Sequence, residues 1–136
     1  MENKICSALA DAAQFRVERG DVERAEDLLR RAIRIAEHGG RANDRFFSWV
    51  NLAHFLEDHD RGEEAEVAFR KAIDSVPMAE FNLRHTIALR ELGELVMTLG
   101  RPDEGLALQM LAMKVFDVLA DEVAQKSVAT LVDRAS

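Results

Sequence analysis

The chain has 136 residues, the usual size of one domain, of which 48% are hydrophobic and 32% charged. This composition is that of a globular protein and excludes an intrinsically disordered chain. The formal net charge of −7 repels a phosphate backbone, so we expect no binding to nucleic acid.

Several classes of protein are disfavoured by what the sequence lacks. A single cysteine, Cys6, has no partner for a disulfide or a thiolate metal site, and we expect it to be buried and inert. The first residues do not resemble a secretory signal, and no apolar run approaches membrane-spanning length. We therefore expect a cytoplasmic protein with no membrane partner.

Hydrophobic periodicity predicts helices along the whole chain. Phe46, Trp49, Leu52 and Leu56, for example, recur at steps of three or four residues, as on one face of an amphipathic helix. In chain order the predicted helices are 3–19, 22–38, 44–59, 62–75, 79–99, 103–120 and 122–134. No Gly or Pro follows Leu106, which leaves open one long helix in place of the last two.

One sequence block recurs three times. Gly20–Ala25, Asp60–Ala65 and Gly100–Gly105 each join two predicted helices, at an unbroken period of 40 residues. Gly20 and Gly100 supply the backbone freedom for a tight turn, and an Asp in each block can accept from free amide groups at the start of the next helix. The small residues that end the blocks allow two helices to approach closely.

The middle block resembles the tetratricopeptide repeat, a family of helical-repeat proteins. Its Trp, Leu, Gly, Tyr, Ala, Phe and Pro pattern is matched in order by Trp49, Leu52, Ala53, Leu56, Ala65, Phe69 and Pro77. The third block matches the pattern in part, and the first is degenerate. The common repeat has about 34 residues, and we expect the extra residues to lengthen helices at Gly39–Asp44 and Met78–Asn82.

The resemblance implies an all-α fold: a right-handed superhelix of three helix-turn-helix repeats with a C-terminal capping helix. We expect one domain, 1–136, with repeat 1 at about 3–40, repeat 2 at about 43–77, repeat 3 at about 79–120 and the cap at about 122–134.

In tetratricopeptide proteins the first helix of each pair lines the concave side of the superhelix. The resemblance therefore implies a partner-binding groove formed by Asp11, Gln14, Glu18, Phe47, Val50, Asn51, His54, Asp58, Ile87, Arg90, Glu91 and Glu94. Carboxylates around an apolar anchor predict a partner segment with basic and apolar side chains. The alternative, that these are ordinary solvated helix faces, remains open.

Some family members hold the C-terminal carboxylate of a chaperone peptide with Lys, Asn and Arg. Only Asn51 falls on one of those positions here, so we do not expect this mode of docking.

The functional expectation is a protein-binding adaptor or scaffold. One alternative is a small secretion-type or regulatory chaperone that shields a client. Another is a homodimer through the terminal helix, with a seam at Val115, Val118, Val123, Val128 and Leu131.

We expect no catalysis, no cofactor and no metal. The sequence has no glycine-rich phosphate loop and no nucleophile with a base arranged by motif. His54 and His59 are five residues apart and would point about 140° away from each other on a helix.

Overall fold

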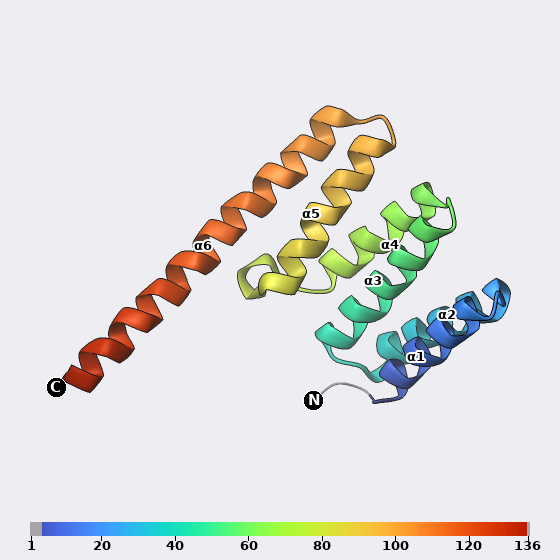
Figure 1. Cartoon of the computed structure of the whole chain (residues 1–136), viewed down its shortest axis with the longest axis horizontal. Helices are drawn as coiled ribbons and strands as arrows, with labels where there is room; N and C mark the ends of the chain where they lie inside the picture. The colour runs from blue at the N-terminus through green and yellow to red at the C-terminus, as the bar shows by residue number, and fades with distance from the viewer. Residues whose placement is uncertain (1–3, 136) are drawn as a thin grey trace. The chain divides into compact units, whose positions relative to one another are not determined.

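The computed structural model describes residues 4–135, and within them it contains helices and no strand (Figure 1). The helices are α1 (Lys4–Glu18), α2 (Val22–Gly39), α3 (Ala42–Asp58), α4 (Gly62–Asp74), α5 (Leu83–Thr98) and α6 (Pro102–Ala135), with a short 3₁₀ segment, η1 (Met78–Glu80). The prediction of an all-α fold is confirmed. None of the helices in residues 4–135 has both the length and the apolar character needed to cross a bilayer.

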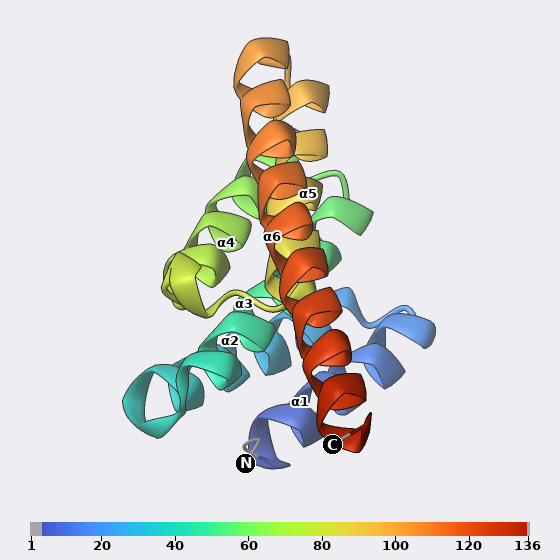
Figure 2. The ribbon, with the colours of Figure 1, turned by 90° about the vertical axis from the view of Figure 1, so that its left-hand side faces the viewer.

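The chain divides into two compact units, one ending at Ala79 and the other beginning at Glu80. In the first unit α1 packs on α2 and α3 packs on α4, while α3 also contacts both α2 and α1. In the second unit α5 packs on α6, beside its first half (Figures 1 and 2). Helices that are consecutive in the sequence therefore pair, as predicted. The prediction of one domain of stacked repeats stays a prediction.

The turn inside each helix pair has the same backbone conformation three times. Gly20, Asp60 and Gly100 have φ angles of +78°, +60° and +92°, which lie in the left-handed region. In each turn the amide of the next residue donates to a carbonyl five residues back: Asp21 to Arg16 at 2.9 Å, Arg61 to Leu56 at 2.9 Å and Arg101 to Val96 at 3.1 Å. This is the Schellman pattern, which satisfies carbonyls at a helix end. The 40-residue sequence period is thus a period of backbone geometry.

Helix pairs close through small residues. Ala13 and Ala53 in the first helices, and Ala25 and Ala65 in the second helices, are at most 2% exposed. In the second unit glycines replace them, and a Cβ atom added to Gly105 would lie 2.6 Å from the carbonyl oxygen of Gly93. The backbones of α5 and α6 are therefore too close at this point for even a methyl group.

The first unit has a joint core where α1, α2 and α3 meet. Cys6 of α1 is buried against Ala32 and Ala36 of α2, and its Sγ lies 3.5 Å from the carbonyl oxygen of Ala32. Burial raises the pKa of the Cys6 thiol, which a hydrogen bond with Ser48 of α3 partly offsets. The prediction that this thiol is buried is confirmed.

An ion-pair network ties α2 to the start of α4. The guanidinium of Arg61, the residue before α4, donates to Glu26 of α2 and, at 2.6 Å, to Glu64 of α4. Arg61 holds the pKa of the Glu26 carboxyl below its usual value. These groups are partly exposed, so the network orients the two helix pairs of the unit more than it stabilises them.

Two sequence expectations are wrong. Met78–Asn82 does not lengthen a helix: it holds η1 and a short connection, and α5 begins at Leu83 because Asn82 caps it. The separate capping helix at 122–134 is also absent, because these residues continue α6 without a break. The sequence has no Gly or Pro there to interrupt the helix, so the single long helix, the alternative left open above, is the one observed.

The cap of α5 depends on the protonation of His85. The amide of Asn82 donates to Nδ1 of His85 at 3.0 Å, and the amide of His85 donates to the Asn82 side chain at 3.2 Å. Nδ1 accepts a hydrogen bond, so it carries no proton in this capping box. The side chain is 3% exposed, and burial lowers the pKa of His85.

We expect the free energy of unfolding to fall as the pH drops below the usual histidine pKa of about 6.5. Below it the unfolded chain binds a proton that the folded chain resists, so the contribution of His85 is complete above this pH and is lost beneath it. Chemical denaturation at about pH 7.5 and about pH 5.5 measures the difference. In His85→Gln, which keeps an acceptor at this position, the pH dependence should shrink. An unchanged dependence would show that His85 is not its source.

We expect Asp60→Gly to stabilise the fold by about 0.5 to 1 kcal/mol, because Gly adopts the left-handed region without a Cβ penalty. Gly100→Ala should destabilise it by about 1 kcal/mol for the same reason. Gly39→Ala is the matched control, since Gly39 ends α2 without a positive φ and a Cβ there meets nothing within 4 Å. Denaturant unfolding that gave the same sign for Gly100→Ala and Gly39→Ala would contradict this account of the turns.

Candidate partner-binding surface

The predicted site residues on α1 are all exposed. They are Asp11, Gln14 and Glu18, and the Gln14 amide donates to the Glu18 carboxylate at 3.4 Å. The two basic side chains near the end of this helix have other contacts: Arg16 lies 4.0 Å from Asp21, and the Arg19 guanidinium lies 4.5 Å from the centre of the Phe15 ring. The carboxylates of α1 therefore keep their negative charge available to a partner.

The predicted residues on α3 differ in how far a partner can reach them. Asp58 is exposed, while Phe47, Asn51 and His54 are half-buried. The Phe47 ring packs edge-on against Phe46, with ring centres 5.2 Å apart, and the His54 ring packs in the same way on Phe69 of α4 at 5.6 Å.

Val50 is only 9% exposed and belongs to the interior of the first unit. Of the two apolar residues that the predicted groove has on this helix, Phe47 and Val50, only Phe47 is thus accessible to a partner. A helix in contact with three neighbours has few outward positions, and Val50 is not one of them.

The α1 and α3 residues correspond to each other through the repeat. Asp11, Gln14 and Glu18 are 40 positions before Asn51, His54 and Asp58, and the two helices contact each other in the first unit. Corresponding positions lie at the same angle around their helix axis from the small residue that packs against the next helix. This places the two sets on corresponding sides of adjacent helices.

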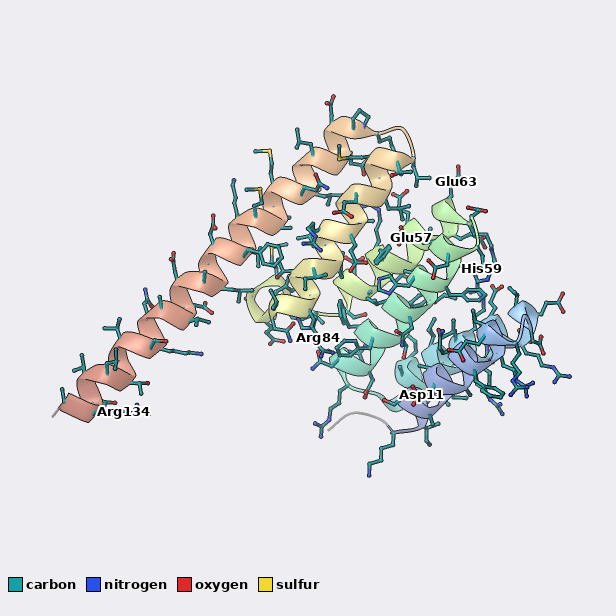
Figure 3. All side chains as sticks on the ribbon, in the orientation of Figure 1. Asp11, Glu57, His59, Glu63, Arg84 and Arg134 are labelled. Carbon is teal, nitrogen blue, oxygen red and sulfur yellow. The ribbon has the colours of Figure 1, made fainter. Side chains whose placement is uncertain are left out.

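One acidic residue on this surface was missed by the sequence analysis. Glu57 is exposed and lies three residues after His54, which brings it to the same side of α3. Figure 3 shows Glu57 on α3 and Asp11 on α1. The three-residue spacing between His54 and Glu57 is the feature of the sequence that could have identified Glu57.

The surface carries more negative than positive charge. Within residues 4–135, neither Asp11 nor Asp58 forms an ion pair. We define the acidic surface as Asp11, Gln14, Glu18, Phe47, Asn51, His54, Glu57 and Asp58 of the first unit. Carboxylates on the same helix faces as one accessible aromatic ring suit cationic and apolar side chains.

The remaining predicted residues lie on α5 in the second unit. Ile87 and Glu91 are half-buried, and Arg90 and Glu94 are exposed and face each other at 3.8 Å. The Arg90–Glu94 pair neutralises charge locally, so this helix face is less acidic than that of the first unit.

No protein-family model matches this chain, and no curated protein is found to be similar to it in sequence.

Two other chemistries were considered from the sequence, nucleic-acid binding and metal binding. Of the arginines clustered around the α2–α3 connection, Arg30 pairs with Glu26 at 2.8 Å and Arg45 donates to the carbonyl of Gly40 at 2.9 Å. In the part of the chain that the structure describes, no three His, Cys, Asp or Glu side chains are grouped so that they could hold a metal ion.

Proposed function

We propose that the chain is a helical-repeat module of the tetratricopeptide type that binds a polypeptide segment and acts as an adaptor or scaffold. The right-handed superhelical stacking of its three helix pairs is part of this proposal. The observation that carries it is the acidic surface on α1 and α3, where equivalent positions of two adjacent helices present polar and acidic side chains, with Phe47 near the start of α3.

The chemistry of this surface selects the kind of partner. Asp11, Glu18 and Asp58 attract Lys and Arg side chains, while the half-buried Phe47 ring offers an apolar contact and a π face for a cation. Exposed charge pairs contribute modestly to affinity, so the apolar contact at Phe47 has to supply much of it. A segment with alternating basic and apolar side chains meets both requirements.

We expect the full chain to bind short peptides that are basic and apolar more tightly than neutral or acidic peptides of the same apolar content. Fluorescence anisotropy with labelled synthetic peptides measures this. Asp11→Lys and Asp58→Lys should each weaken binding by roughly 3- to 10-fold at low salt, and the difference should shrink as salt rises. Phe47→Ala should weaken binding by about 10-fold at any salt concentration.

Asp27→Lys is the matched control, because Asp27 is exposed on α2 and the change in net charge is the same. If it weakens binding as much as Asp11→Lys, the net charge of the protein, and not the acidic surface, attracts the peptide. Glu94→Lys tests the α5 face separately. Unchanged affinity in Phe47→Ala would contradict binding at the acidic surface, and unchanged affinity in Glu94→Lys would show that the α5 face takes no part.

A further inference from the structure

Half of α6 extends beyond the helix on which it packs. α5 has 16 residues and α6 has 34, which correspond to about 24 Å and about 51 Å of helix. Arg134, near the end of α6, lies well away from α5 (Figure 3), and every residue from Asp121 to Ala135 is exposed. A helical segment of this length is marginal in water without packing. A covering surface is therefore needed to stabilise it.

The exposed apolar side chains of α6 form one stripe along its length. We define the α6 stripe as Leu106, Met110, Met113, Ala124, Val128 and Leu131. Steps of three and four residues keep these positions within about 60° of one another around the helix axis. The five large side chains are between 51% and 64% exposed. Val115, Val118 and Val123, which the sequence suggested for a seam, lie off this stripe.

The internal repeat shows that the stripe occupies a face that is used for packing elsewhere. The position 40 residues before Met113 is Ile73 of α4, and the position 80 residues before it is Ile33 of α2. Ile33 is only 7% exposed, in the unit where α3 packs on α2. Met113 is 64% exposed.

At two positions on this face the third pair also lacks the charged residues of the first two pairs. At the positions of Leu106 and Met110, α2 has the ion pair Glu26–Arg30 at 2.8 Å and α4 has Glu66–Arg70 at 3.0 Å. The third pair thus replaces a charged pair by two apolar side chains and leaves them exposed, as expected for a face that an apolar surface covers.

We propose that two copies of the chain dimerise by antiparallel packing of their α6 helices along the α6 stripe. With Met113 opposite Ala124 of the second copy, a large side chain meets a small one at two symmetric places. The same register sets Leu106 opposite Leu131 of the second copy, at both ends of the interface. A two-fold interface must be self-complementary in this way.

Charge at the edge of the stripe fits the same register. Lys114 and Asp121 lie on one side of it, and within residues 4–135 neither forms an ion pair. Because they are seven residues apart, antiparallel packing brings Lys114 of each copy close to Asp121 of the other. Two-fold parallel packing would instead set the two Lys114 residues on opposite edges of the interface, each away from Asp121 of the other copy. The charges therefore select a second copy in antiparallel orientation.

Asp117 is the one charged residue in line with the stripe. In the proposed register Asp117 lies near the two-fold axis, opposite Ala120 of the second copy. The small Ala120 side chain leaves space through which the Asp117 carboxylate can contact water. The burial of this charge limits the affinity of the dimer.

The dimer is independent of peptide binding, because α6 carries no residue of the acidic surface. Sedimentation velocity of the full chain over a range of concentrations should show a monomer–dimer equilibrium. Met113→Glu with Leu131→Glu should raise the dissociation constant at least about 100-fold, since each change occurs twice in the interface. Val118→Glu is the matched control: Val118 is 56% exposed on α6 but off the stripe, so this variant should still dimerise. Far-UV circular dichroism checks that each variant is folded.

A charge swap tests the orientation. Lys114→Glu and Asp121→Lys should each weaken the dimer by roughly 3- to 10-fold, and the two together should restore it. Asp117→Leu should tighten it. A chain that stays monomeric at every concentration would overturn the proposal, and so would a dimer that survives Met113→Glu with Leu131→Glu. Weakening by both single charge variants with no recovery in the double variant would overturn the antiparallel register.

Discussion

The backbones of α5 and α6 approach each other closely where Gly93 of α5 meets Gly105 of α6. The Ala residues at the equivalent positions of the first unit are almost fully buried in their helix pairs. Close packing at one point fixes which face of each helix turns inward. It also requires a connection that reverses the chain within two or three residues, which the repeated left-handed turn supplies. The remaining features of the molecule follow from these inward faces.

Both proposed binding surfaces consist of residues that face outward from the helix pairs. On α1 and α3 several outward positions are acidic, while Arg30, Arg61 and Arg70 of the first unit are paired with Glu26 and Glu66 of α2 and α4. Negative charge therefore remains where Asp11 and Asp58 lie. On α6 the same construction leaves an apolar face, because no further helix pair follows in the described residues to cover it. One surface suits cationic segments and the other suits an apolar helix.

The repeat made most of the fold predictable. The 40-residue period located the turns and the small residues, and the helix boundaries of the first four helices agree with the structure within two residues. Helix starts that depend on local capping were predicted less accurately. Asn82 and His85 form a reciprocal cap that starts α5 later than the hydrophobic pattern indicates, and Asp60, expected to cap α4, instead takes the left-handed turn position. Both outcomes depend on hydrogen bonds between neighbouring residues, to which hydrophobic periodicity is insensitive.

The candidate site was less predictable than the fold. The spacing of polar residues identified the outward side of α1 and α3, but the burial of Val50 depends on how α3 packs on its neighbours. A one-helix projection contains no such information. The prediction of a separate capping helix was wrong for a different reason. The family resemblance suggested a break in the helix, but no residue between Leu106 and Ala135 is a helix breaker.

The most direct test of close helix packing is the sign of the change in unfolding free energy for Gly105→Ala. In an open helix Ala is more stable than Gly by about 1 kcal/mol. Here the added Cβ would lie 2.6 Å from the carbonyl oxygen of Gly93 and 2.9 Å from the amide nitrogen of Met97, and backbone atoms cannot move aside as a flexible side chain can. We predict that denaturant unfolding shows a net loss of stability. A gain of about 1 kcal/mol, the value for an unpacked helix, would contradict the close approach of α5 and α6.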